Sequence, residues 1–206
     1  MTLAILGTLL LLIFGSFGMA TSLFQDTDVR QSAENQLRGI KLLLQRDLEL
    51  SDFWLNNSLE RSTPDGWRDA LSVSALGDWD NPANFDGASD RPLWNRYVVW
   101  YATQEPDARL YRQVVEPGGL ITVPYAGLST NLSDLNPDGN ANALYTRLMS
   151  NRVRNFQVTS RLQNGTVRVG LRLRAEGSRR PNTATRTVEN LELVMTFHPR
   201  NTFPKI

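Results

Sequence analysis

The first twenty-five residues of the chain carry no charged side chain, and this stretch limits the fold more than any other. A helix needs about 20 apolar residues to span a bilayer core, so the run predicts a transmembrane helix over residues 1–25. A secretory signal peptide is the competing interpretation, but this run is longer than the usual apolar region and no Lys or Arg precedes it. A buried core helix is disfavoured because apolar residues face every direction. The apolar side chains are Leu3, Ile5, Leu6, Leu9, Leu10, Leu11, Leu12, Ile13, Phe14, Phe17, Met19, Leu23 and Phe24.

The stretch that follows continues the helical pattern. Asp26 lies four residues before Arg30, and Glu34 lies four before Arg38, which is the favourable order for ion pairs along a helix. No proline occurs before Pro64. Apolar residues recur at helical spacing at Ala33, Leu37, Ile40, Leu44 and Leu48. We therefore predict one helix from about residue 2 to about residue 52, whose second half, residues 26–52, is amphipathic.

The remainder of the chain, residues 53–206, is predicted to be one globular domain built on an antiparallel sheet. Alternating or β-branched runs predict strands near residues 71–76, 96–103, 108–115, 156–162, 167–174 and 188–197. Asn164 and Gly165 separate two of these runs and favour a type I′ hairpin turn. Residues 144–149 are predicted to form one helical turn. The expected fold class is α+β: a long N-terminal helix, with a membrane half (1–25) and an amphipathic half (26–52), packed on an antiparallel β-sheet.

Cysteine and histidine usage excludes several kinds of site. The chain has no cysteine and one histidine, His198. Disulfides, thiolate metal sites and multi-histidine metal sites are therefore excluded. The formal net charge is +1, but it is unevenly distributed: residues 1–144 have a net charge of −8 and residues 145–206 a net charge of +9. This asymmetry predicts polar docking, either within the molecule or between copies.

No pattern of catalytic residues is present. The sequence lacks a Gly-x-Ser-x-Gly motif, a P-loop and a pair of metal-binding histidines. A catalytic triad would have to depend on His198, the one histidine. Because His198 directly precedes Pro199, a histidine at the end of an edge strand is a better interpretation than a catalytic base. We therefore predict that the chain is not an enzyme and has no small-molecule substrate.

One loop resembles the start of a calcium-binding loop. Asp134, Asn136 and Asp138 occupy the first, third and fifth positions of the pattern D-x-[DN]-x-[DN]-G. Calcium takes six to eight oxygen ligands, and this spacing directs three side chains toward one point. The twelfth position is Tyr145 instead of Glu, and a surface loop rich in Asx turns is the alternative. No other cofactor is predicted, and a second acidic loop with Asp78, Asp80, Asp86 and Asp90 lacks the spacing.

Arginines alternate along one predicted strand. Arg168, Arg172 and Arg174 share one face of that strand, and Arg161 lies across the predicted hairpin. This basic face is a candidate contact for an acidic partner surface. A solvated outer face of an antiparallel sheet is the alternative. Nucleic-acid binding is disfavoured because no tryptophan is interleaved with these arginines.

The order of these elements resembles that of type IV pilin-like proteins, and is closest to minor pilins and the J-type pseudopilins of type II secretion. The resemblance covers the whole chain in architecture and is carried by three segments. Residues 1–3, Met-Thr-Leu, are similar to the mature start of such a subunit. Residues 97–101 and 110–114 resemble the hairpin of minor pilins, and residues 197–201, Phe-His-Pro-Arg-Asn, resemble their final strand.

Two features depart from that family. The family has Glu at the fifth mature position, where it is thought to pair with the N-terminal amine of a neighbouring subunit; this chain has Ile5. The family also has a basic leader ending in Gly, and numbering from the mature protein would explain why none precedes Met1. Some tip subunits lack the Glu, so Ile5 fits a tip or priming position, or a relative that does not assemble.

The resemblance implies a structural minor pilin or pseudopilin subunit of a type IV pilus-like or type II secretion filament. The subunit would be anchored in the bacterial inner membrane by one helix before assembly, with its C-terminal domain in the periplasm or on a pilus. Its partners would be the membrane and other pilins or pseudopilins. Small residues four apart let helices approach closely, so the anchor and assembly residues are expected at Met1, Thr2, Leu3, Ser16, Gly18, Ala20 and Ser22. The alternative is a membrane-anchored periplasmic binding domain that does not polymerise.

Overall fold

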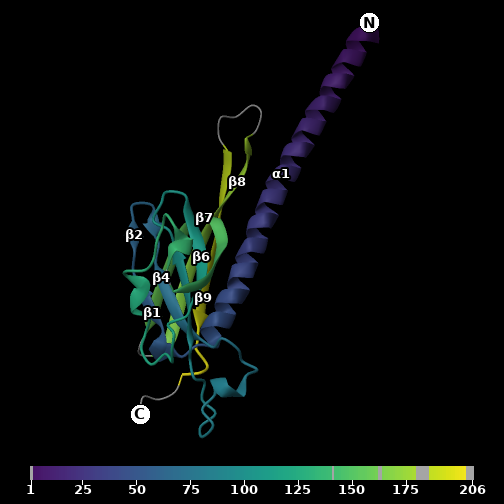
Figure 1. Ribbon diagram of the computed structural model, residues 1–206. Helices are drawn as coiled ribbons and strands as arrows, with labels where there is room; N and C mark the ends of the chain where they lie inside the picture. Colours follow the sequence, from purple (N-terminus) through teal and green to yellow (C-terminus); the bar gives the residue numbers. More distant parts are fainter. Residues whose placement is uncertain (1, 141, 162–163, 180–185, 203–206) are drawn as a thin grey trace. The chain divides into compact units, whose positions relative to one another are not determined.

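The computed structural model describes residues 2–140, 142–161, 164–179 and 186–202. Within these ranges, the side chains of residues 2–4, 22, 25, 26, 176–179, 186 and 187 are not described. The chain divides into two compact units. The helix unit contains residues 1–35 and 174–191, and the sheet unit contains residues 36–173 and 192–206. Figure 1 labels the helices and strands, and each unit is described by itself.

The helix unit holds the larger part of α1, which runs from Thr2 to Glu49. Hydroxyl groups inside this helix donate to backbone carbonyls four residues earlier. Ser16 Oγ bonds to Leu12 O, and Thr27 Oγ1 bonds to Leu23 O, each at 2.8 Å. These bonds satisfy the polar side chains within the helix itself, so they need no water or other partner.

The last turns of α1 in the helix unit make contacts with β9 (Arg186–Phe197). Arg30 forms ion pairs with Glu34 at 2.9 Å and with Glu189 of β9 at 3.4 Å. Ala33, the first residue of the predicted apolar stripe, is buried. The exposed ion pairs contribute little to the free energy of folding by themselves. The buried side chain of Ala33 therefore indicates where this stretch of the helix is packed.

The sheet has seven strands in the order β1-β4-β5-β6-β7-β8-β9. Their bounds are β1 Asn57–Leu59, β4 Ala70–Ala75, β5 Arg96–Ala102, β6 Ala108–Val115, β7 Ala143–Arg161, β8 Thr166–Arg179 and β9 Arg186–Phe197. A separate two-stranded sheet pairs β2 (Ser62–Thr63) with β3 (Gly66–Trp67). Short 3-10 helices occur at Phe53–Leu55 (η1), Pro82–Asn84 (η2), Ala126–Leu128 (η3) and Pro137–Gly139 (η4). The described pairings from β1 to β8 are antiparallel.

The predicted strands are confirmed, except that β7 is much longer than the strand predicted at residues 156–162. β4, β5, β6, β8 and β9 lie within a few residues of their predicted positions. A turn does lie at the predicted Asn-Gly pair, where Gly165 has φ +60° and Arg161 pairs with Thr166. The helical turn predicted for residues 144–149 is wrong, because β7 begins at Ala143 and pairs there with β6. Pairing with β6 involves register shifts, which an alternation pattern cannot reveal.

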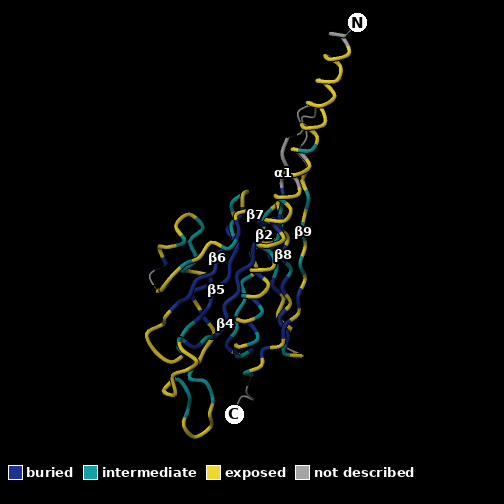
Figure 2. The backbone as a smooth tube through the Cα atoms, turned by 90° about the vertical axis from the view of Figure 1, so that its right-hand side faces the viewer, coloured by how far each residue is buried: buried dark blue, intermediate teal, exposed yellow. Residues whose placement is uncertain are grey.

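The core of the sheet unit lies on both faces of β5, as its uniformly apolar sequence predicts. Val98, Trp100 and Ala102 belong to the cluster that includes the helix residues Ile40, Leu44 and Leu48. Tyr97, Val99 and Tyr101 belong to a second cluster on the opposite face. Figure 2 shows these central strands in the colour of buried residues. Ile40, Leu44 and Leu48 therefore share one core with the strands of the sheet unit.

The predicted fold class is wrong in the way it joins helix and sheet. We expected one long helix, with a membrane half and an amphipathic half, packed on an antiparallel sheet. Only residues 36–49 of α1 belong to the sheet unit, whereas residues 2–35 cluster with residues 174–191. The apolar pattern of the helix could not show this division, because it does not reveal which strands cover each turn. The dominant element is a large seven-stranded antiparallel sheet.

The membrane half of the prediction is corrected as well. In the part of the chain that the structure describes, no helix is long and apolar enough to cross a membrane.

Candidate functional site

The apolar segment, residues 5–24 of α1, exposes its large apolar side chains. Their exposed fractions range from 42% at Ile13 to 75% at Phe24. Figure 2 shows this part of α1 almost entirely in the colour of exposed residues. Soluble monomeric proteins rarely expose a continuous apolar surface of this extent, and such surfaces mark interaction sites. The apolar segment is therefore the first candidate site.

Three of the predicted assembly residues can be placed on this segment. Ser16 is turned back onto the helix by its bond to Leu12 O, and Ala20 is half-buried. No atom lies within 4 Å of the position that a Cβ would take at Gly18. The helix surface beside Gly18 is therefore open to close approach by another helix. Met1 lies outside the described residues, as do the side chains of Thr2, Leu3 and Ser22.

The predicted basic face is divided between the two units. Arg168 and Arg172 belong to the sheet unit, and Arg174 belongs to the helix unit. Arg168 is exposed on β8, and Arg172 forms an ion pair with Glu192 of β9 at 3.0 Å. Arg174 is half-buried. The prediction of a partner contact therefore applies most directly to Arg168, whose charge has no opposite charge paired with it in the described part of the chain.

The predicted calcium loop does not form a cation site in the described structure. Both carboxylate oxygens of Asp134 accept hydrogen bonds from Arg61 Nη2, at 2.8 and 2.7 Å. Asn136 precedes the short helix η4, which contains Asp138, and its side chain makes no capping bond. Among the described residues, no group of three or more His, Cys, Asp or Glu side chains is placed to hold a metal ion. Arg61 lies 73 residues from Asp134 in sequence, so local spacing could not show this pairing.

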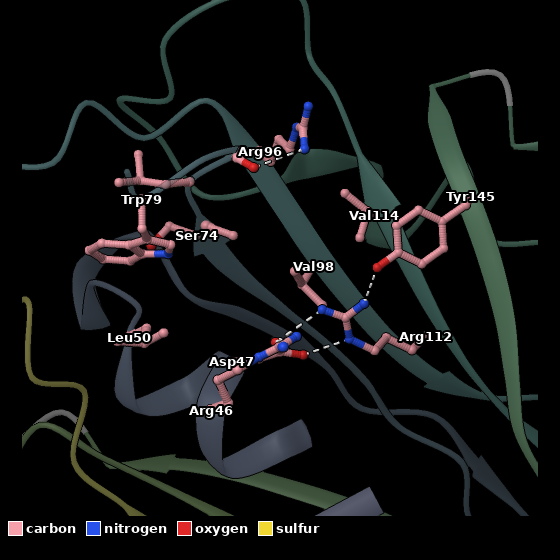
Figure 3. Close-up of a pocket in the computed structure, with 13 residues that line it drawn as sticks. Arg46, Asp47, Leu50, Ser74, Trp79, Arg96, Val98, Arg112, Val114 and Tyr145 are labelled. Carbon is pink, nitrogen blue, oxygen red and sulfur yellow. Dashed lines mark hydrogen bonds and ion pairs between the residues drawn. The ribbon is translucent and has the colours of Figure 1, made fainter. Parts of the chain in front are cut away.

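The helix–sheet junction is a buried ion-pair network that the sequence analysis missed. Arg112 of β6 donates to Asp47 of α1 through Nε at 2.7 Å and Nη2 at 3.0 Å (Figure 3). Trp100 Nε1 donates to the same carboxylate at 3.1 Å, and Arg112 Nη1 donates to Tyr145 OH at 2.5 Å. The side chains of Arg112 and Asp47 are 6% and 5% exposed. The junction therefore holds α1 on β5, β6 and β7 through charge-assisted bonds with a fixed geometry.

The electrostatics of the junction follow from its burial. Burial lowers the pKa of Arg112, but the hydrogen bond and charge of Asp47 outweigh it and leave that pKa raised. Arg112 also lies over the Trp100 ring, 5.9 Å from its centroid. A buried ion pair of this kind is costly to break, because removing one partner leaves the other charge buried and unpaired. The signal in the sequence was Asp47 itself, which follows Leu44 by three residues on the buried stripe.

A pocket of about 280 Å³ opens beside the junction (Figure 3). Trp79 and Arg96 contribute to its lining, together with the aliphatic side chains of Leu50 and Val98. The lining contains no histidine, and its one carboxylate, Asp47, is bound by Arg112. The pocket therefore offers neither a free general base nor an activated nucleophile. We assign the junction a structural role.

A second buried pair of charged residues connects β7 to the start of β4. Asp69 accepts hydrogen bonds from the backbone N–H groups of Arg61 at 2.9 Å and Val158 at 2.7 Å. Arg68 is fully buried and donates to the backbone carbonyl of Arg154. Burial raises the pKa of Asp69 and lowers that of Arg68. Asp69 therefore satisfies two backbone N–H groups where β7 passes the start of β4, whereas Arg68 Nε and Nη2 are buried without a hydrogen-bond partner among the described residues.

Comparisons with known proteins return no match. No protein family, curated protein or solved structure is similar to this chain at a significant level. The resemblance to type IV pilin-like proteins therefore stays a prediction, and the functional conclusion depends on the geometry of the described residues.

Proposed function

We propose that this chain is a structural subunit of a pilin-like filament, in which the apolar segments of neighbouring subunits pack together. The observation that carries the proposal is the exposure of apolar side chains on every side of residues 5–24. The sheet unit, in contrast, has complete cores of its own. An exposed apolar helix gains free energy when another apolar surface covers it. A bundle of like helices covers every side, whereas a single binding partner covers one.

The chemistry of the segment supports packing among helices. Residues 1–25 carry no charged side chain, so no ionised side chain has to leave water when helices come together. The hydroxyls of Thr8 and Ser16 donate to Ile5 O and Leu12 O, so they too can be buried without losing a partner. The open surface at Gly18 permits close contact between helix backbones.

Ile5 bears on the position of the subunit in such a filament. Its side chain is 62% exposed and offers an apolar contact at the place where the pilin-like family has Glu. Packing at this position therefore does not depend on a charge pair with a neighbour's amine. The subunit therefore fits positions where that pair is not required, either at a tip or between copies of this chain. Its neighbours are other pilins or pseudopilins, including further copies of this chain.

Localisation is part of the proposal but stays a prediction. A filament subunit of this class would begin at the bacterial inner membrane, with the sheet unit in the periplasm or on a pilus. Fractionation of cells that express the full chain would measure this location directly.

The test compares wild type with Leu11→Arg in the full-length chain, diluted out of detergent. Leu11 is 74% exposed, so the substitution leaves the fold intact but places an unpaired charge in any helix bundle. We expect elongated assemblies of the wild type by sedimentation and electron microscopy, and dispersed Leu11→Arg chains. Leu120→Arg is the matched control, because Leu120 is 63% exposed in the sheet unit and should not affect assembly. Normal assembly of Leu11→Arg would contradict packing of the apolar segments against one another, and no wild-type assembly would favour a binding domain that does not polymerise.

A further inference from the structure

A polar groove of about 250 Å³ lies over β7, β8 and β9 in the sheet unit. Phe156 and Val158 of β7 belong to the core, so the alternate residues Gln157 and Thr159 face outward. Gln157 pairs with Gly170 of β8, and no atom lies within 4 Å of the position of a Cβ at Gly170. The floor of the groove is therefore open at this glycine. The rest of the lining consists of Asn155, Arg161, Arg168, Glu192 and Val194.

The charges of the groove favour an anionic occupant. Glu192, the one carboxylate in the lining, is paired with Arg172 at 3.0 Å. Arg161 and Arg168 make no ion pair or side-chain hydrogen bond with any residue that the structure describes. The register places these two arginines diagonally across β7 and β8, so they repel each other unless an anion lies between them. Guanidinium groups bind carboxylates through paired N–H donors, so carboxylates fit this groove.

The same chain carries an acidic loop that matches this requirement. Residues 77–90 contain four Asp and no Lys or Arg. Asp78, Asp80 and Asp90 are exposed, and Figure 1 shows the loop projecting beyond one end of the sheet. Within the described residues, Asp80 and Asp90 form no ion pair, so their charges are available to another molecule.

The acidic loop is already ordered in the single chain. Trp79 packs edge-on against Trp94 with ring centroids 6.0 Å apart. Asn81 caps η2 through a hydrogen bond from Ala83 N–H, and Phe85 pairs with Pro92 across the base of the loop. A preformed loop loses little conformational entropy when it binds, which favours its use as a docking element.

We propose that the polar groove binds the acidic loop of a second copy of this chain, through the carboxylates of Asp80 and Asp90 on Arg161 and Arg168. The proposal deepens the filament function and rests on it, because it names one contact between subunits. Groove and loop are two different surfaces of the same molecule. A contact between different surfaces is head-to-tail and can repeat without closing, which is the symmetry that a filament requires.

Disulfide crosslinking tests the contact directly, because the natural chain has no cysteine. Full-length Thr159→Cys chains are mixed with Ala88→Cys chains and oxidised. We expect crosslinked dimers in the mixture and none from either variant alone, and a ladder of larger products from a chain with both substitutions. Leu135→Cys, 86% exposed on another loop, replaces Ala88→Cys in the control and should give no product with Thr159→Cys.

Charge reversal shows whether the carboxylates and guanidiniums cause this contact. In this experiment, Arg161→Glu with Arg168→Glu should lower the crosslink yield about tenfold. The reverse change, Asp80→Arg with Asp90→Arg, should lower the yield similarly when made alone. Mixing a chain that has reversed arginines with one that has reversed aspartates should restore the yield. Reversal of the exposed Arg161 and Arg168 should not change the melting temperature, whereas Asp90→Arg, at φ +53°, should lower it slightly.

The outcomes separate this inference from the filament proposal. Ile13→Cys chains report contacts between apolar segments in the same assemblies. If they crosslink while the groove and loop do not, the groove contact is wrong and the filament proposal stands. If neither pair crosslinks, both are wrong. A groove crosslink that survives charge reversal would overturn the acidic loop as the natural occupant. The same would follow if nucleic acid removed the crosslink equally from the mixture with natural charges and from the mixture in which both sets of charges are reversed.

Discussion

The two ends of helix α1 differ in how their apolar side chains are covered. Ile40, Leu44 and Leu48 are fully buried against the sheet of the same chain. Leu11 and Phe24, near the other end, are 74% and 75% exposed. The buried end has one apolar stripe that a single sheet can cover, whereas the exposed end is apolar on every side and needs several neighbours. The first packing problem is solved by folding, and the second, in our proposal, by assembly.

The largest effect is expected at the junction that fixes the buried end. Asp47→Ala leaves the buried Arg112 charge unpaired and should lower the free energy of unfolding by about 3–5 kcal/mol. All five tryptophans lie in the sheet unit, so urea unfolding followed by fluorescence reports this change. Arg46→Gln is the control, because Arg46 is 57% exposed beside the same carboxylate and should cost less than about 1 kcal/mol. Equal effects of the two variants would mean that the buried ion pair between Asp47 and Arg112 does not stabilise the fold as we assign.

Truncating one leucine at each end of α1 tests the comparison directly. Leu44→Ala creates a cavity in the core and should cost about 2–5 kcal/mol. Leu11→Ala removes an exposed side chain and should change the free energy of unfolding by no more than about 0.5 kcal/mol. Urea unfolding of both variants in detergent provides the measurement. If Leu11→Ala destabilises the chain as much as Leu44→Ala, the exposed segment contributes to the fold of the single chain.

The sheet unit and the apolar segment should also respond differently to pH. Burial raises the pKa of Asp69 above its value in the unfolded chain, so the folded state keeps its proton to higher pH. The stability from this group is therefore present below the unfolded pKa and is lost as pH rises through the folded pKa. The difference in unfolding free energy between wild type and Asp69→Asn should fall over this window. Burial also raises the pKa of Asp52, but that group is present in both proteins.

If the difference in unfolding free energy between wild type and Asp69→Asn instead rises with pH, burial does not raise the pKa of Asp69 as assigned. Assembly through the apolar segment should not follow the same window, because residues 1–25 contain no titratable side chain. Sedimentation of the full-length chain across the same pH range provides this second measurement.

The smallest effect is expected on the outer face of the sheet. Arg172 and Glu192 form an ion pair in which both side chains are about half exposed. Arg172→Gln should therefore change the free energy of unfolding by about 0–1 kcal/mol, and less at high salt. Urea unfolding at low and high salt provides the measurement. A loss comparable to that of Asp47→Ala would mean that this pair is buried in solution.

The sequence predicted the central sheet well because its signals are local. The strand β5 is apolar on both faces, and Trp100 and Tyr101 belong to opposite cores. The Asn-Gly turn fixed the register between Arg161 and Thr166. The first half of β7 was missed because its pairing with β6 contains irregularities that no period describes. The division of α1 between two units was missed because it depends on which strands cover each turn.

The candidate sites were harder to predict, because their partners are distant in sequence. Asp134 has the spacing of a calcium ligand, but Arg61 binds its carboxylate. Asp47 was visible as a charge on an apolar stripe, but nothing local identifies Arg112 of β6 as its partner. The exposed apolar segment, in contrast, is a property of composition and could be recognised from the sequence alone.

The central claim is that neighbouring subunits cover the apolar segment on every side. It is tested by labelling single-cysteine chains with a water-soluble maleimide, after assembly without detergent or lipid. Leu11, Leu12 and Phe14 lie on different sides of the helix and are 74%, 71% and 71% exposed in the single chain. Leu42, 60% exposed in the sheet unit, is the reference position. We predict that Leu11→Cys, Leu12→Cys and Phe14→Cys all react at least about tenfold more slowly than Leu42→Cys. Labelling at the reference rate at any of the three would contradict coverage on every side.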